Sequence, residues 1–496
     1  YVEALNNLGV LLSSAGRFDE ATTCLEKAHA INPKHLETLN NLGTIRNAQG
    51  KTKEAEDWYL KALKINPNFA DTHYNLGNVR KSRGHLEESV SQYQNALALK
   101  PDFSLALNNL GVALQGLGKL KEAAAKFSDA LALDENFAEA HRNLGEVQAK
   151  LGNANAALAA YDNAISLQAG CAGTHYARSL VRKFSVGDPD IEQLRLLSEK
   201  EGLDEVERAQ YLSALGEACD QIGSYDEAFT CFETANLLMS KTRPFDLQTY
   251  LDRVDLIKKL YSSAPNTERS EPSGHTPIFI VGMSRSGKTL TESILAQANN
   301  VFASGESRIW LHTVNAACLQ LGLPAHFPEH PQSITSSDAK VISDAYLQRV
   351  LNLAPGSKFS VNTLPIHLWC IGLILTTIPH ARIIYCQRDP FDCCLRNFMR
   401  WYGTGQSYSN RLSDTAAYYK IYSDMMAFWI ERFHNRILTV TYEEIVSETD
   451  NTTKKLFEFC GFEEDHPRVR QAFTTRDLGH WRNYEAHLQP LRDAFE

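Results

Sequence analysis

A repetition with a period of 34 residues in the first part of the chain constrains its fold more than any other feature. Each unit contains two helical patterns of apolar residues with a turn near its second glycine. The two recurring glycines are Gly9, Gly43, Gly77, Gly111 and Gly145, and Gly16, Gly50, Gly84, Gly118 and Gly152. A single unit of this size cannot bury its own apolar face, so stacking of neighbouring units must supply the core.

The repetition extends to alanine and to proline (Pro33, Pro67 and Pro101), and it indicates a known family. Alanine recurs at Ala28, Ala62, Ala96, Ala130 and Ala164. The pattern resembles the tetratricopeptide repeat family, which implies an α-helical superhelix of five units over residues 1–170. The period then decays, and we expect degenerate helical repeats and a connector over residues 171–261. Because Pro, Ser and Gly dominate residues 262–275, we expect a linker there and a second domain over residues 276–496.

One asparagine occupies the same position in every unit. These residues are Asn7, Asn41, Asn75, Asn109 and Asn143. In tetratricopeptide arrays this position faces the concave groove, and the series resembles the asparagine ladder of the O-linked N-acetylglucosamine transferases. A side-chain amide offers both a donor and an acceptor, so the ladder could bind a protein or peptide through its backbone. The alternative is that these asparagines only join one helix to the next by hydrogen bonds.

A glycine-bracketed loop opens the second domain. Gly282 and Gly287 enclose four residues, Lys288 and Thr289 follow, and an apolar strand is expected over residues 277–281. This is the spacing G-x-x-x-x-G-K-[ST] in the order strand, loop and helix. Backbone N–H groups of such a loop and the helix N-terminus behind it attract anions. The loop therefore predicts a phosphate or sulfate site, to which Arg285 and Lys288 add positive charge.

A second anion site is indicated at the end of another strand. The strand over residues 381–386 is followed by Arg388, where a nucleotide triphosphatase would need an acid to hold magnesium. The planar guanidinium of arginine suits a second phosphate. Arg396 and Arg400 follow Arg388 in the chain. On the helix expected after Pro390, both would lie near the side on which Arg388 lies. A third strand, residues 437–441, leads into Tyr442.

Residues 276–496 resemble the sulfotransferase family, on the side of the protein-tyrosine sulfotransferases. The resemblance implies a P-loop-type α/β domain with a parallel sheet. It also implies transfer of a sulfuryl group from 3′-phosphoadenosine-5′-phosphosulfate to an acceptor hydroxyl, tyrosine in a protein, without a metal. The loop would hold the 5′-phosphosulfate, and Arg388 the 3′-phosphate. The candidate cofactor-binding residues are Ser284, Arg285, Ser286, Gly287, Lys288, Thr289, Arg388, Arg396, Arg400 and Tyr442.

The same resemblance implies a catalytic base, and the loop offers two cations for catalysis. Residues 305–308 resemble the G-E-x-R segment whose glutamate is the general base, so Glu306 would take the proton of the acceptor hydroxyl. Arg285 and Lys288 would stabilise charge that develops on the leaving phosphate. The alternative for Glu306 is a carboxylate that only interacts with a helix dipole.

The chain departs from the family pattern at several positions. Lys288 stands where the family has threonine, Asn362-Thr363 where it has aspartate-lysine, and Arg396 where it has serine. The segment before the G-x-W-R-x-Y ending, residues 479–484, is shorter. Two alternatives therefore stay open: a P-loop kinase or nucleotide triphosphatase, and a catalytically impaired repeat scaffold that only binds nucleotide and partner.

Composition restricts the partners. A net charge of −9 argues against nucleic-acid binding, and no apolar run approaches a membrane span of about 18–20 residues. The 10 scattered cysteines favour a reducing, cytoplasmic compartment, and the histidines lack metal-ligand spacing, so no metal is expected. Because the sequence begins at Tyr1 inside a repeat, we expect a fragment whose targeting segment could be missing. Oligomerisation and the identity of the acceptor stay open.

Overall fold

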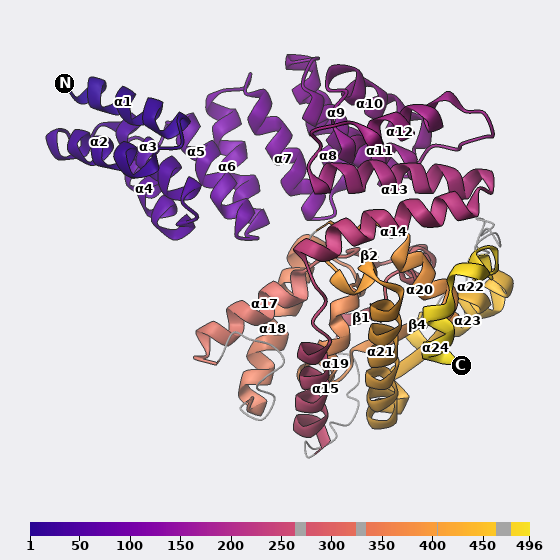
Figure 1. Cartoon of the computed structure of the whole chain (residues 1–496). Coiled ribbons are helices and arrows are strands. Elements are labelled where there is room, and N and C mark those ends of the chain that lie inside the picture. The colour runs from indigo at the N-terminus through magenta and orange to yellow at the C-terminus, as the bar shows by residue number, and fades with distance from the viewer. Residues whose placement is uncertain (263–273, 324–333, 404, 463–477) are drawn as a thin grey trace. The chain divides into compact units, whose positions relative to one another are not determined.

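The computed structural model describes residues 1–262, 274–323, 334–403, 405–462 and 478–496 (Figure 1). It divides into two compact units, Tyr1–Arg182 and Lys183–Glu496. The expected linker and the segment before the G-x-W-R-x-Y ending lie almost wholly outside the described residues. Each unit is described by itself.

The first unit consists of paired antiparallel helices, and the predicted α-helical repeat fold is confirmed. Within the second repeat, a Cβ built on Gly43 would lie 2.5 Å from Cε1 of Tyr59, so only glycine lets the two helices approach this closely. The helices are α1 (Val2–Ser14), α2 (Phe18–Ile31), α3 (Leu36–Ala48), α4 (Thr52–Ile65), α5 (Ala70–Ser82), α6 (Leu86–Leu99), α7 (Ser104–Gly116), α8 (Leu120–Leu133), α9 (Ala138–Lys150), α10 (Ala154–Leu167) and α11 (Ala172–Ser179).

The second unit contains a parallel five-stranded sheet in the order β2-β3-β1-β4-β5, which confirms the predicted α/β class. Its strands are β1 (Thr276–Val281), β2 (Val301–Ala303), β3 (Phe359–Thr363), β4 (Arg382–Gln387) and β5 (Ile437–Thr441). The central strand β1 is buried along its whole length, as expected for a parallel strand covered on both faces. The carboxyl ends of β1, β3, β4 and β5 therefore meet at one edge, where α/β proteins bind ligands.

Helices of the second unit precede, connect and follow these strands. They are α12 (Pro189–Glu199), α13 (Glu205–Ile222), α14 (Tyr225–Thr242), α15 (Leu247–Ser262), α16 (Lys288–Leu295), α17 (Ile309–Gln320), α18 (Ser336–Leu353), α19 (Ile371–Thr377), α20 (Pro390–Phe398), α21 (Leu412–Phe433), α22 (Tyr442–Ser447), α23 (Thr449–Cys460) and α24 (Gln489–Phe495), with the 3-10 helices η2 (Pro365–Cys370), η3 (Ser407–Asn410), η4 (His434–Arg436) and η6 (His480–His487). None of the helices described is both long and apolar enough to cross a membrane.

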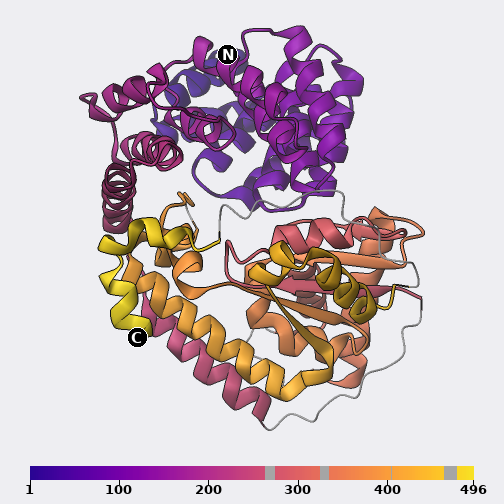
Figure 2. The ribbon, with the colours of Figure 1, turned by 90° about the vertical axis from the view of Figure 1, so that its right-hand side faces the viewer.

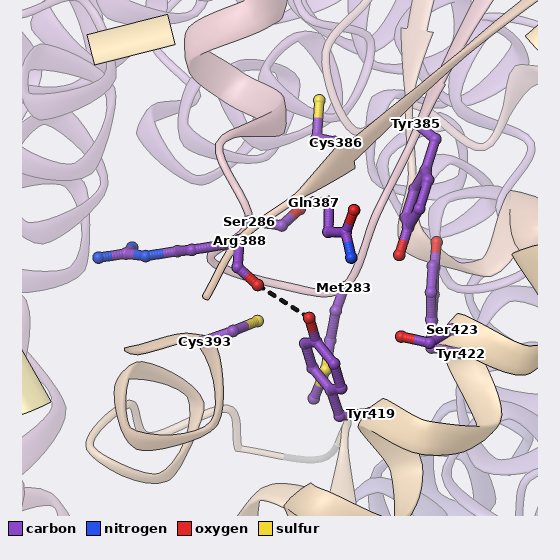
Figure 3. Close-up of a pocket in the computed structure, with 10 residues that line it drawn as sticks. All are labelled: Met283, Ser286, Tyr385, Cys386, Gln387, Arg388, Cys393, Tyr419, Tyr422 and Ser423. Carbon is purple, nitrogen blue, oxygen red and sulfur yellow. Dashed lines mark hydrogen bonds between the residues drawn. The ribbon is translucent and has the colours of Figure 1, made fainter. Parts of the chain in front are cut away.

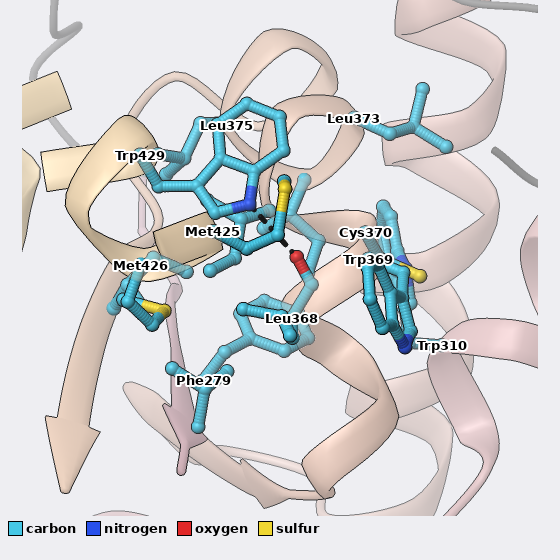
Figure 4. Close-up of a cluster of buried hydrophobic side chains, with 14 of the residues drawn as sticks. Phe279, Trp310, Leu368, Trp369, Cys370, Leu373, Leu375, Met425, Met426 and Trp429 are labelled. Atoms are coloured by element: carbon cyan, nitrogen blue, oxygen red, sulfur yellow. Dashed lines mark hydrogen bonds between the residues drawn. The ribbon is translucent and has the colours of Figure 1, made fainter. Parts of the chain in front are cut away.

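The larger apolar core of the second unit lies between one face of the sheet and helices α15, α17, α18, α19 and α21. Phe279, Trp310 and Trp429 are among its most buried side chains, and the indole N–H of Trp429 donates to the carbonyl of Leu368 at 3.0 Å (Figure 4). Helices α15 and α21 lie side by side in both views (Figures 1 and 2). The core thus includes a helix from before the sheet.

Helices α13 and α14, which follow the repeats in the chain, are bound to the α/β part of the second unit by polar and aromatic contacts. The Asn236 side chain donates to the Phe398 carbonyl at 2.6 Å, and the rings of Phe229 and Phe398 stack at 5.5 Å. The Asp220 carboxylate accepts from the Tyr484 hydroxyl at 2.6 Å. These two helices therefore form part of the body that carries the site.

Candidate active site

The loop after β1 turns through unusual backbone angles. Gly282 has φ 151°, Arg285 φ 66° and Gly287 φ 100°. A Cβ on Gly282 would lie 2.5 Å from the Cys386 carbonyl oxygen, and one on Gly287 would lie 3.0 Å from Cδ2 of Tyr442. The two glycines are thus required by both conformation and space, and they bring the loop against the ends of β4 and β5.

Buried side chains hold the loop from behind. The Gly282 N–H donates to the Tyr422 hydroxyl at 2.7 Å, and the Asn397 side chain donates to the Ser284 carbonyl at 2.7 Å. The Lys288 amine donates to the Met283 carbonyl at 2.9 Å. Burial lowers the pKa of Lys288, while the nearby carboxylate of Glu306 acts to raise it. Lys288 therefore supports the loop and also lies within the electrostatic reach of Glu306.

A small cavity lies behind the loop, between the end of β4 and helix α21 (Figure 3). Its volume is about 10 Å³, which is room for roughly one water molecule. The hydroxyl of Tyr419 points to the carbonyl of Arg388 across it, at 2.8 Å. The Ser286 hydroxyl, which lines it, is buried without a hydrogen-bond partner among the described residues. The cavity suits a bound water and is far too small for a nucleotide.

Arg388 lies at the end of β4, beside the loop, as predicted. Its Nη1 donates to the Arg285 carbonyl at 3.1 Å, and its guanidinium carbon lies 4.1 Å from the ring centre of Tyr442. Its Nη2 lies 3.8 Å from a carboxylate oxygen of Asp392, and the side chain is 5% exposed. The structure thus brings Arg388, Arg285 and Tyr442 together, because β4 lies between β1 and β5 in the sheet.

The acids after Arg388 fix the surrounding chain. Asp389 caps α20 by accepting from the Asp392 N–H at 3.0 Å. The Asp392 carboxylate accepts from the backbone N–H groups of Gly479 at 2.7 Å and Trp481 at 3.0 Å. Sequence reasoning missed this role for Asp392, whose partners lie more than eighty residues away in the chain. The G-x-W-R-x-Y ending is therefore attached directly to the helix behind Arg388.

Arg396 and Arg400 have neighbours on helix α13. Nη1 of Arg396 lies 3.9 Å from one carboxylate oxygen of Asp220. The other carboxylate oxygen accepts from Nε2 of His480 at 2.7 Å. Burial acts to raise the pKa of Asp220, but His480, Tyr484 and Arg396 together lower it. Arg400 lies just past the end of α20. The contact of Arg396 with α13 could not be inferred from the sequence.

Glu306 is exposed in the loop between β2 and α17, and Thr289 and Arg285 are exposed as well. Asn362, which stands where the family has an acid, is buried on β3 with 1% exposure. Its side-chain nitrogen donates to the Ser304 hydroxyl at 3.1 Å and to the Ser307 carbonyl at 3.2 Å. The structure thus gives Asn362 a contact with the loop that carries Glu306.

The repeated asparagines form hydrogen bonds from one repeat to the preceding one. Asn41 donates to Asn6 at 3.0 Å, and Asn75 donates to Asn40 at 3.0 Å. The same contact joins Asn143 to Asn108 at 3.0 Å, and Asn109 donates to Asn78 at 2.9 Å and to the hydroxyl of Tyr74 at 3.1 Å. The amide nitrogens of these four residues therefore connect adjacent helices. A role in peptide binding would rest on their oxygens.

Metal ligands do not gather anywhere in the described part of the chain: it contains no group of three or more histidine, cysteine or carboxylate side chains that could hold a metal ion.

Comparisons with known families divide the chain in the same way as its repeats and its sheet. Residues 277–466 match the model of the sulfotransferase family. Four models of tetratricopeptide repeats match residues 1–68, 58–90, 77–118, 116–152 and 138–171.

Among individual proteins, the chain is 25% identical over 340 residues to an uncharacterized protein of Aquifex aeolicus (strain VF5), which covers 63% of this chain. The chain spans 44% of the length of that relative. Similar solved structures are a thermophilic tetratricopeptide repeat protein of Thermus thermophilus, with 23% identity and a TM-score of 0.32, and a tetratricopeptide repeat protein of Parabacteroides merdae, with 20% identity and a TM-score of 0.38. They cover 36% and 50% of this chain, and 98% and 95% of their own lengths.

Proposed function

The chain joins tetratricopeptide repeats to a sulfotransferase-family domain, and from this premise we propose that it transfers a sulfuryl group from 3′-phosphoadenosine-5′-phosphosulfate to a hydroxyl of a protein, in particular to tyrosine. The observation that carries the proposal is the position of Arg388. Its guanidinium contacts the carbonyl of Arg285 at 3.1 Å, so a buried cation lies directly beside the glycine-bracketed loop, whose conformation is suited to an anion.

The residues at this edge of the sheet fit a nucleotide with two separate anionic groups. Backbone N–H groups of residues 284–289, with the N-terminus of α16, would hold the 5′-phosphosulfate. Arg388, stacked on Tyr442 at 4.1 Å, would hold the 3′-phosphate through its fork of donors. Arg396 and Arg400 would add positive charge on the side of α13. The absence of a Cβ at Gly287 lets the loop lie directly against the ring of Tyr442.

Glu306 and two cations would perform the chemistry. The bound donor would supply an activated sulfuryl group and leave as adenosine 3′,5′-bisphosphate. Glu306 would take the proton of the acceptor hydroxyl while the hydroxyl oxygen attacks sulfur and the bond from sulfur to the phosphate oxygen breaks. Arg285 and Lys288 would stabilise the charge that develops on that phosphate. Lys288 would replace the lysine that the family has at the position of Thr363. The domain would be an active enzyme if Lys288 does so, and an impaired scaffold if it does not.

The acceptor is proposed to be a protein because a repeat region precedes the transferase domain. Stacked repeats present extended surfaces suited to polypeptides. The side-chain oxygens of Asn41, Asn75 and Asn143 would accept backbone N–H groups of a bound peptide, while their nitrogens keep the contacts between repeats. At Asn109 a peptide would have to share or replace the Lys81 amine, which donates to the side-chain oxygen at 3.2 Å.

A calorimetric titration tests the donor assignment. We expect adenosine 3′,5′-bisphosphate to bind without any metal, and ATP to bind much more weakly whether or not magnesium is added. Binding of magnesium-ATP alone would contradict the proposal and favour a kinase or nucleotide triphosphatase.

Transfer of radiolabelled sulfate from the donor to a tyrosine peptide tests competence, with the matched phenylalanine peptide as control. Binding of the bisphosphate without transfer to any hydroxyl acceptor would favour the impaired scaffold. Transfer to a sugar or small alcohol, and not to the peptide, would refute the protein acceptor.

A further inference from the structure

The loop that carries Glu306 is held by a buried carboxylate that lies outside every motif discussed above. Glu292 lies on α16, four residues after Lys288, and therefore on the same face of that helix. Its side chain is buried at 8% exposure, and one of its carboxylate oxygens accepts from the N–H of Gly305 at 2.8 Å. Gly305 directly precedes Glu306 and has φ 64°, so this bond fixes the turn from which Glu306 projects.

The other side of the same loop is bound to β3. The Thr363 N–H donates to the Gly305 carbonyl at 3.0 Å, and the Ser304 N–H donates to the Val361 carbonyl at 2.9 Å. Asn362 reaches across with its two side-chain bonds to Ser304 and Ser307. Both backbone groups of Gly305 are therefore held, its N–H by α16 and its carbonyl by β3.

We propose that Glu292, together with Asn362, positions Glu306 for proton transfer. The inference rests on the proposed function, because it assumes that Glu306 acts as the base. Glu292 is a positioning residue: its side chain is buried, and its bond is to the backbone of Gly305.

The arrangement also connects the base to the loop that binds the anion. Lys288 and Glu292 lie on successive turns of one short helix. The Lys288 amine donates to the Met283 carbonyl, and the Glu292 carboxylate accepts from the Gly305 N–H. Burial and the nearby carboxylate of Glu306 raise the pKa of Glu292, whereas the Gly305 N–H acts to lower it. A shift of α16 would therefore move both the anion loop and the turn before Glu306.

Hydrogen–deuterium exchange on the full chain tests the contact directly. In Glu292→Ala, the Gly305 amide loses its acceptor, and we expect exchange in a peptide covering residues 304–307 to become about tenfold faster. Glu292→Gln keeps an oxygen acceptor at the same place and should keep the slow exchange. Ser293→Ala, an exposed position on the same helix, is the matched control and should change nothing.

The same variants test the consequence for turnover. Glu292→Ala should lower kcat by about a hundredfold, as a misplaced catalytic group does, while the affinity for adenosine 3′,5′-bisphosphate stays within about twofold. Glu292→Gln should restore most of kcat, and Asn362→Ala should show the same separation of kcat from binding. Unchanged exchange at residues 304–307 in Glu292→Ala would refute the contact, and unchanged kcat with faster exchange would refute its catalytic purpose.

The two proposals fail in different ways. If the wild-type chain does not bind adenosine 3′,5′-bisphosphate, the proposed function is wrong, whatever the exchange shows. If it binds the bisphosphate and transfers sulfate, but Glu292→Ala loses nucleotide affinity and kcat together, Glu292 only supports the fold.

Discussion

At the scale of single residues, the Arg388 side chain contacts three neighbours, and a bound phosphate would have to share this side chain with them. It lies against the Arg285 carbonyl, the Tyr442 ring and the Asp392 carboxylate. A phosphate could replace the distant carboxylate contact, at 3.8 Å, with a shorter charge-assisted one. This exchange of partners would make the affinity depend on the 3′-phosphate in particular.

Arg388→Ala should therefore weaken binding of adenosine 3′,5′-bisphosphate by about 1.5–3 kcal/mol. Adenosine 5′-monophosphate, which lacks the 3′-phosphate, should lose much less. Calorimetry with both nucleotides measures the difference, and Lys340→Ala, which removes one cation from an exposed position on α18, is the control. An equal loss for both nucleotides would mean that Arg388 only supports the loop.

A buried histidine gives the second unit a dependence on acid. His367 has 0% exposure, and its ring centre lies 5.3 Å from that of Phe279. Burial lowers the pKa of His367 to about 3. The unfolded chain, with a histidine pKa near 6.5, binds the proton first as the pH falls. The contribution of this residue to stability is therefore complete above pH ~6.5 and is lost as the pH falls from there toward about 3.

Between pH 7 and pH 5 this residue should lower the free energy of unfolding by about 2 kcal/mol. In His367→Leu that part of the pH dependence should disappear, whatever the substitution costs at pH 7. Urea unfolding at the two pH values, followed by tryptophan fluorescence, measures it. His434→Leu, at an exposed position, should keep the wild-type dependence. If the free energy of unfolding falls between pH 7 and pH 5 by the same amount in His367→Leu as in the wild type, the acid sensitivity arises from another residue.

At the scale of elements, three longer apolar runs were predictable as strands, whereas the three-residue strand β2 and the polar strand β3 were not. Strands β1, β4 and β5 are apolar runs and form within one residue of the predicted bounds. Strand β3, F-S-V-N-T, was missed because its polar side chains are buried and find partners far away in the chain. Ser360, for example, is 3% exposed, and its hydroxyl oxygen lies 3.0 Å from Nε2 of His275.

The site shows the same limit. Arg388 was predictable because a strand end directs it to the loop. The bond from Glu292 to Gly305 joins α16 to the turn after β2, and no local pattern reports such a contact. The asparagine ladder was predictable as a series, but not the direction of its bonds, since Asn75 reaches back to Asn40 in the previous repeat.

Asn75→Ala should lower the free energy of unfolding of the first unit by about 1 kcal/mol, because the bond to Asn40 is lost. Thermal unfolding followed by circular dichroism measures the loss. Asn68→Ala, an exposed asparagine in the preceding turn, should have no effect. Unchanged stability with weaker binding of a peptide acceptor would assign the ladder to the groove alone.

At the scale of the whole molecule, the two compact units have different requirements for folding. The second unit, residues 183–496, includes α13 and α14. Without these helices, His480 and Tyr484 lose the Asp220 carboxylate, and Phe398 loses its contacts with Phe229 and Asn236.

We expect a chain of residues 183–496 to unfold in one cooperative thermal transition, and a chain of residues 276–496 to show no such transition. Differential scanning calorimetry on both chains, with residues 1–182 as a separate control, measures this. Equal melting temperatures for the two longer chains would show that α13 and α14 are dispensable to the fold.

The carboxylate of Asp220 finally links the order of synthesis to the order of folding. Its partners His480 and Tyr484 follow it by 260 and 264 residues. A ribosome that adds about 5–20 residues per second needs tens of seconds to cover that distance. The repeats can stack as they emerge, because each contacts only its neighbours, but α13 must wait for the partners of its acid until residues 480–484 have been synthesised. During this interval residues 1–182 can already be folded while the second unit is still incomplete, and a chaperone would find its target in the second unit.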